Sequence, residues 1–239
     1  MKVRIKFSKY DNMRFIGHLD TMRYFQKAMR RADIDIAYST GFSPHQIMSF
    51  AAPLGVGITS EGEYLDIEVN SSRSTRESVS ALNAVMVKGF TVLDYRRLSD
   101  DAKTAMSIVS CADYTLTYRE GYETDKTFEQ LCEAVHVFYE VPDKIEIVKQ
   151  TKKSEKIIDL KQLIYDFKVL FVEGKPAFYL KVSTGSSDNI KPELVLEHFY
   201  QYLGLELHKF TFQVHRHDVY TGNPTDGFCS LNDMGEVIK

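Results

Sequence analysis

The chain has 239 residues, of which 44% are hydrophobic and 26% are charged, and its formal net charge is −3. These values favour one or two compact domains, and a pI near 6.2 argues against indiscriminate affinity for nucleic acid. No apolar run is long enough to span a bilayer, and the N-terminus alternates basic and apolar residues instead of presenting a signal peptide's apolar block. We therefore expect a cytoplasmic protein without a membrane partner.

The first 40 residues predict a strand and then a basic helix. Lys2, Arg4 and Lys6 alternate with apolar residues in the strand, and the helix is predicted from Gly17 to Ala32. Nine Lys/Arg and four Asp/Glu give residues 1–40 a formal charge of +5. The polar side of the helix fits either a solvated face or a ligand surface; it carries Arg23, Lys27, Arg30 and Arg31.

Residues 38–69 combine turn residues with apolar ones. Gly41, Pro44 and Pro53 interrupt any regular element, and an alternating strand follows at residues 64–69. The segment is too apolar for a disordered linker. We expect an ordered loop packed over a sheet, where binding surfaces often lie.

Several motifs between residues 18 and 68 form a specific set. They are HLD at residues 18–20, the basic helix, GFSPH at 41–45, APLGVG at 52–57 and SEGEYLDIE at 60–68. Together they resemble the bacterial radical-SAM-linked family, which is uncharacterised and whose members are encoded beside a radical SAM protein or fused to one. The resemblance covers about the first third of the chain. It implies a radical SAM protein as partner, and it implies no mechanism because the family has no assigned activity.

The remaining elements predict two passes of the same order. A helix at 75–88 and a strand at 90–97 complete a first β-α-β-β-α-β series if residues 34–36 or 47–50 supply its second strand. The second series has strands at 113–118 and from 145, a lysine-rich turn at 149–156, a hairpin at 165–182 and a strand at 210–215; its helices span 125–139 and the residues after Asn189, with Pro192 in the first turn.

The predicted fold class is therefore α+β, with two tandem ferredoxin-like (βαββαβ) units whose antiparallel sheets are covered by helices. The expected division is residues 1–100 for the N-terminal domain with its Pro/Gly loop, 104–219 for the C-terminal domain and 220–239 for a tail.

The only catalytic candidates are His18, Asp20 and His45. With Arg23 they could form an acid/base pair or a phosphate-binding corner if the loop folds over the start of the helix. The alternative is structural, with Asp20 supporting the helix and His18 bonding the loop. This alternative is favoured because no nucleophile and no paired carboxylates accompany them.

Two further groups are candidates for anion or metal binding. The small-residue loop 183–189, with Ser186 and the nearby Lys191, could present backbone N–H groups to a phosphate or could simply connect a strand to a helix. His215 and His217 lie on one strand face, but two imidazoles without a positioned third ligand favour an ordinary strand edge, and Arg216 adds a phosphate contact. Cys111, Cys132 and Cys229 form no zinc-ribbon or cluster motif. We expect neither a metal nor a cofactor.

The leading functional hypothesis is an accessory protein that binds transfer or ribosomal RNA and assists a radical SAM partner that modifies RNA or protein. One alternative is a protein-interaction module that docks on that partner through the loop, without RNA. Another is an enzyme using His18, Asp20 and His45. The expected RNA or anion contacts are Arg4, Arg23, Lys27, Arg30, Arg31, Ser43, His45, Ser186, Lys191 and Arg216.

Overall fold

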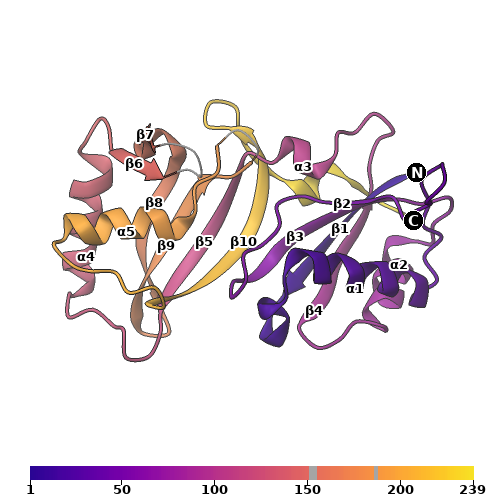
Figure 1. Cartoon of the computed structure of the whole chain (residues 1–239), viewed down its shortest axis with the longest axis horizontal. Coiled ribbons are helices and arrows are strands. Elements are labelled where there is room, and N and C mark those ends of the chain that lie inside the picture. Colours follow the sequence, from indigo (N-terminus) through magenta and orange to yellow (C-terminus); the bar gives the residue numbers. More distant parts are fainter. Residues whose placement is uncertain (151–154, 186–187) are drawn as a thin grey trace. The chain divides into compact units, whose positions relative to one another are not determined.

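The computed structural model describes residues 1–150, 155–185 and 188–239. The chain divides into two compact units, of which the first comprises Met1–Ser110 with Arg216–Lys239 and the second comprises Cys111–His215. Each unit combines helices with an antiparallel sheet (Figure 1). The predicted α+β class is confirmed. No helix in the described ranges is both long and apolar enough to cross a membrane.

The first unit combines one sheet with two main helices. Its elements are β1 (Lys2–Lys9), η1 (Asp11–Phe15), α1 (His18–Arg31), β2 (Met48–Phe50), β3 (Thr59–Glu68), α2 (Thr75–Asn83), β4 (Phe90–Arg97), α3 (Ala105–Ile108), the end of β10 (Phe212–Asn223), β11 (Gly227–Ser230), η4 (Leu231–Met234) and β12 (Glu236–Val237). The sheet has the order β12-β4-β1-β3, with β2 and the end of β10 each also pairing with β3.

One face of this sheet carries the core of the first unit. Val3, Ile5 and Phe7 of β1 are at most 1% exposed and pack with Phe25 of α1 and Leu82 of α2. The rings of Phe7 and Phe25 lie 4.5 Å apart between centroids. Both helices therefore cover the same face, which is the face that the alternation in β1 predicts.

The starts of the two helices are fixed differently. Gly17 precedes α1 and makes no side-chain cap, whereas α2 begins with a capping box between Ser74 and Glu77. α2 ends at Asn83, five residues before the predicted end, and the Asn83 side chain bonds both backbone groups of Val92 at 2.8 Å. The loop after the helix is thereby tied to β4.

The last residues of the chain, expected as a tail, are part of the first unit. β11 pairs with β10, and β12 pairs with β4 through Glu236 and Val237. Leu231 of η4 is fully buried. Spacing without periodicity did not reveal these elements, because β11 and β12 are short and β12 pairs with a strand far earlier in the sequence.

The second unit repeats the element order with an insertion. Its elements are β5 (Cys111–Tyr118), α4 (Phe128–Val135), the π-helical turn η2 (His136–Glu140), β6 (Glu146–Gln150), β7 (Glu155–Asp159), η3 (Leu160–Leu163), β8 (Ile164–Val172), β9 (Lys175–Ser183), α5 (Pro192–Tyr202) and the start of β10. The sheet order is β10-β5-β9-β8, and β6 and β7 form a separate two-stranded sheet among the described residues.

Aromatic rings form much of the core of the second unit. Phe199 of α5 lies 5.4 Å from both Phe138 and Phe167, and 5.6 Å from Phe178, between ring centroids. Such edge-to-face contacts add directional packing to apolar burial. α5 begins at Pro192, which the sequence predicted in the first turn, and Lys191 precedes it without a side-chain cap.

Gly62 allows a close approach between β3 and β10 within the first unit. A Cβ atom at this position would lie 2.5 Å from the carbonyl oxygen of His217 and would also overlap Asp218. Only glycine fits without a backbone shift.

We expect Gly62→Ala to lower the midpoint of thermal unfolding, because overpacking against backbone costs about 1–3 kcal/mol. Gly17→Ala is the matched control, since φ at Gly17 is −76° and no described atom lies within 4 Å of its added methyl. Circular dichroism melts of both variants test this, and equal midpoints would contradict it.

Candidate anion-binding surface

The cations of β1 are held inside the first unit. The Arg4 guanidinium is 2% exposed and donates to both carboxylate oxygens of Asp66, at 2.7 and 2.9 Å. It also donates to the backbone oxygen of Leu231 at 3.2 Å. Lys6 pairs with Asp218 at 3.0 Å. The predicted phosphate contact at Arg4 therefore does not lie at the surface.

Arg216 is also internal. Its Nε donates to Glu63 at 3.0 Å, its Nη2 donates to the Ala52 carbonyl at 2.7 Å, and both ionic partners are more than 90% buried. Nearby, Lys9 is buried and donates to the Ile16 carbonyl at 2.8 Å, and burial is the main cause that lowers its pKa. A buried charge needs such partners because desolvation costs several kcal/mol. Arg216 is thus an internal partner of Glu63 and not an exposed phosphate contact.

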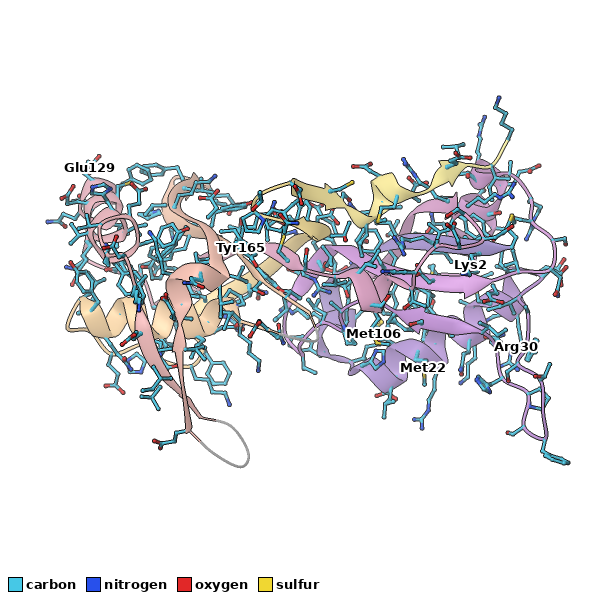
Figure 2. The ribbon with its side chains drawn as sticks, turned by 90° about the horizontal axis from the view of Figure 1, so that it is seen from above. Lys2, Met22, Arg30, Met106, Glu129 and Tyr165 are labelled. Carbon is cyan, nitrogen blue, oxygen red and sulfur yellow. The ribbon has the colours of Figure 1, made fainter. Side chains whose placement is uncertain are left out.

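By contrast, all four predicted cations of α1 are exposed: Arg23, Lys27, Arg30 and Arg31. We call this group the α1 face. Arg23 lies 3.6 Å from Asp20 in a solvent-exposed pair, a type that contributes little stability. Arg31 lies over the Tyr24 ring at 5.9 Å. Figure 2 shows Arg30 at the surface of the first unit. These side chains can reach a partner.

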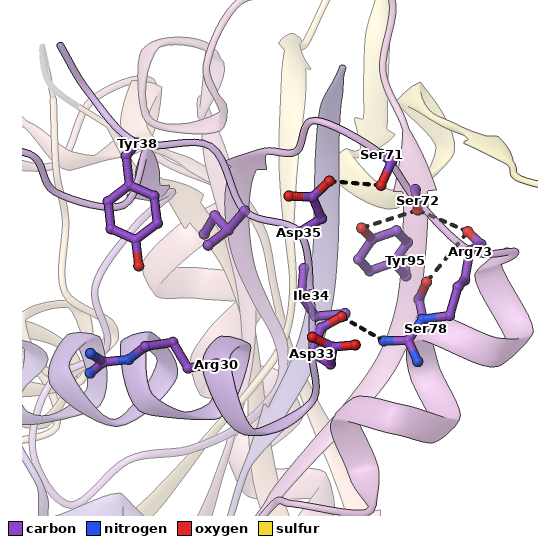
Figure 3. A pocket seen from close by; sticks show the side chains of 11 residues that line it. Arg30, Asp33, Ile34, Asp35, Tyr38, Ser71, Ser72, Arg73, Ser78 and Tyr95 are labelled. Atoms are coloured by element: carbon purple, nitrogen blue, oxygen red, sulfur yellow. Dashed lines mark hydrogen bonds between the residues drawn. The ribbon is translucent and has the colours of Figure 1, made fainter.

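A polar pocket of about 610 Å³ adjoins the α1 face. Figure 3 shows Arg30 and Tyr38 at one end, and Arg73 with the hydroxyl groups of Ser72 and Tyr95 at the other. We call it the Arg30–Arg73 pocket; its lining also includes Asp33, Ile34, Asp35, Ile36, Ser71 and Ser78. It lies where the end of α1 meets the start of α2.

Arg73 connects these two helices. Its Nη2 donates to the carbonyl oxygens of Ala32 and Asp33, at 2.6 and 3.0 Å, just beyond the last turn of α1. A cation suits this position because the end of a helix carries a partial negative charge. Arg73 makes no ion pair among the described residues, so its remaining N–H groups can serve a ligand.

Two carboxylates balance the two guanidinium groups of the pocket. Asp35 accepts hydrogen bonds from Asn70 Nδ2 at 2.9 Å and Ser71 Oγ at 2.7 Å, and these bonds lower the pKa of its carboxyl group. Asp33 has a left-handed backbone with φ +53°. The formal charges of these four side chains cancel within the lining of the pocket.

The three catalytic candidates make separate contacts. The His18 ring packs edge-on against Phe50 at 5.2 Å, Asp20 pairs with Arg23, and His45 Nδ1 lies 2.9 Å from Ser39 Oγ. No hydrogen bond or ion pair among the described residues joins His18, Asp20 and His45.

Among the described residues, the other predicted contacts do not belong to the α1 face or to the lining of the Arg30–Arg73 pocket. Ser43 and His45 are exposed in the loop after Tyr38, and Lys191 is exposed immediately before α5. Ser186 and residues 151–154 of the lysine-rich turn lie outside the described residues. His217 Nδ1 lies 3.5 Å from Glu61.

Comparison with known proteins places the chain in a family. Residues 2–192 match the family described as an uncharacterized protein conserved in bacteria, DUF2344. The chain belongs to this family. No curated protein matches it.

A solved structure shares the fold of this DUF2344 member. The similarity is to one chain in the crystal structure of a Cbf5-Nop10-Gar1 complex, with a TM-score of 0.51 and 10% sequence identity. It covers 91% of this chain and 48% of that chain, so the DUF2344 member spans about half the length of the protein it matches. At this identity the likeness concerns the fold alone.

Sequence reasoning missed the pocket residues that lie just before α2. Ser71, Ser72 and Arg73 stand in a short polar run before a capped helix, which is a signal for a turn but not for a pocket. Tyr95 and Asp35 carry no local signal. Only the fold brings these side chains beside Arg30.

We expect Asn70→Ala with Ser71→Ala to raise the pKa of Asp35 toward its ordinary value of 3.8. In the parent protein the depressed pKa contributes stability that is present above the unfolded-state pKa and is lost as pH falls through the folded-state pKa. Acid unfolding of the variant should therefore begin at a higher pH. Carboxyl NMR titration measures the shift, with Glu77 as the internal control; an unchanged Asp35 pKa would contradict the assignment.

Proposed function

We propose that this protein binds RNA through the α1 face and the Arg30–Arg73 pocket, and that it assists a radical SAM partner. The observation that supports RNA binding is the clustering of four exposed cations on one helix beside a pocket with two arginines, in a chain of net charge −3. Cations that contact phosphates gain affinity by releasing counterions.

The partner is proposed from the motif set, which resembles the radical-SAM-linked family. The substrate would be transfer or ribosomal RNA, which the protein would present to the radical SAM enzyme for modification. We also propose that both units are ferredoxin-like. The spatial strand orders β4-β1-β3-β2 and β10-β5-β9-β8 support this. Along the chain, a helix follows the first strand of each unit and another helix precedes its last strand.

Charge reversal on the α1 face tests RNA binding. We expect Arg23→Glu with Arg30→Glu to abolish retention of RNA at low salt without unfolding the protein, because two phosphate contacts become repulsive. Lys88→Glu with Lys103→Glu is the control, since both lysines are exposed and the change in charge is equal. Single Arg→Gln variants of the α1 face should bind RNA more weakly. Filter binding at several salt concentrations should show that their affinity falls less steeply with salt. Unchanged RNA retention by the double reversal would refute the proposal.

The pocket carboxylate Asp33 offers a test of opposite sign. Asp33→Asn removes a negative charge and keeps a residue type that tolerates a left-handed backbone. We expect severalfold tighter RNA binding at low salt, with Asp100→Asn as an exposed control outside the pocket. Fluorescence anisotropy would measure both affinities, and an unchanged or weaker affinity for Asp33→Asn would count against the pocket as an anion site.

An apolar surface supports a second candidate, a protein-interaction module that needs no RNA. Phe15, Leu19 and Val56 are 57%, 60% and 63% exposed, and the hydrogen bond from Gly57 N to Arg14 O at 2.8 Å holds the loop beside η1. Exposed apolar groups of this kind often mark protein contacts.

A pull-down of the radical SAM partner separates the two candidates. We expect the association to fall after nuclease treatment of the extract if RNA bridges the proteins. Retention that resists nuclease but is lost in a Phe15→Ser, Val56→Ser variant would favour direct docking. His18, Asp20 and His45 receive no comparable support as an enzyme site, because they make separate contacts.

A further inference from the structure

The loop between Tyr38 and Gln46 presents one aromatic ring entirely to solvent. Phe42 is at the tip of this loop and its exposure is 112% of the reference value, the highest of the large hydrophobic residues described. A single exposed apolar side chain is ordinary at a protein surface. The fixed loop and the neighbouring cations make Phe42 informative.

The loop is held in a defined shape. Ser39 N donates to the His45 carbonyl at 2.8 Å, and His45 N donates back to Ser39 Oγ at 3.1 Å. The His45 ring adds a contact of 2.9 Å to the same hydroxyl group. Gly41 has φ +113°, which L side chains rarely adopt. These features fix the turn that carries Phe42.

The base of the loop is attached to α1 and to the pocket. Gln46 Nε2 donates to the Gln26 carbonyl of α1 at 3.2 Å and to the Tyr38 hydroxyl at 3.4 Å. Tyr38 lines the Arg30–Arg73 pocket, and its backbone bridges to Gln46. Phe42 is four residues from each end of this bridge, so it lies within about 14 Å of the pocket's edge.

We propose that Phe42 is a stacking platform for an unpaired base of single-stranded RNA, whose phosphates lie on the α1 face. This inference rests on the proposed function and names the class of RNA. Aromatic side chains beside cationic grooves stack on bases that are free of pairing, whereas the bases of a duplex are already stacked and their grooves offer no ring face. The exposed cations near the loop's base favour a nucleic acid over an apolar protein surface.

The test compares single-stranded and duplex RNA of one sequence by fluorescence anisotropy at low salt. The parent protein should bind the single strand more tightly. Phe42→Ala should weaken binding of the single strand about fivefold to a hundredfold and leave binding of the duplex unchanged. Phe42→Tyr should retain affinity, and Phe42→Leu, which stays apolar but cannot stack, should lose it.

Phe210→Ala is the matched control, because Phe210 is 57% exposed and belongs to the second unit. All three Phe42 variants should fold and melt as the parent does, since the Phe42 ring is fully exposed and its loss removes no packing. If Phe42→Ala binds the single strand as well as the parent does, the platform is refuted while RNA binding by the α1 face stands. If Phe42→Leu retains affinity, stacking is refuted. If the parent binds neither RNA, the proposed function fails as well.

Discussion

Opposite charges on neighbouring strands decide which cations of the first unit remain available to a partner. Arg4 and Asp66 face each other from β1 and β3, and Arg216 reaches Glu63 from β10. Arg4, Arg216 and Glu63 are buried and Asp66 is 12% exposed, so removing one partner of either pair would leave the other poorly solvated. The positive excess of residues 1–40 thus separates into an internal set that holds the sheet together and an external set on α1.

The external set explains how an acidic protein could still recognise an anion. Long-range attraction to RNA is weak for a chain of net charge −3. Recognition would then depend on local features: a row of guanidinium and ammonium groups, a pocket whose carboxylates limit how many phosphates enter, and a ring that meets a base. This arrangement favours selectivity over strong general affinity.

Local patterns predicted the elements well and their partners poorly. The alternation in β1 and the apolar stripe of α1 identified the core face, since both depend on residues a few positions apart. Local patterns made the basic residues of β1 appear exposed, because the acid that pairs with Arg4 is 62 positions away. The same holds for Arg216 of β10, whose acidic partner is 153 positions away.

The same limit applies to the candidate site. Arg30 was expected at the surface from helical periodicity alone, whereas its pocket also needs Asp35, Arg73 and Tyr95 from three other segments. The pairing of β12 with β4 was likewise beyond local patterns, since a single pass along the chain cannot say which distant strands will pair.

The Arg73 guanidinium both stabilises the fold and lines the pocket. Arg73 closes the end of α1 through two carbonyl groups and lines the pocket with the same side chain. Its loss would loosen the end of a helix and also remove a proposed ligand contact, so a fall in affinity would have to be read together with a measurement of folding. The Arg30 side chain makes no such structural contact among the described residues. A change in affinity in an Arg30 variant would therefore report more directly on the proposed binding to the pocket.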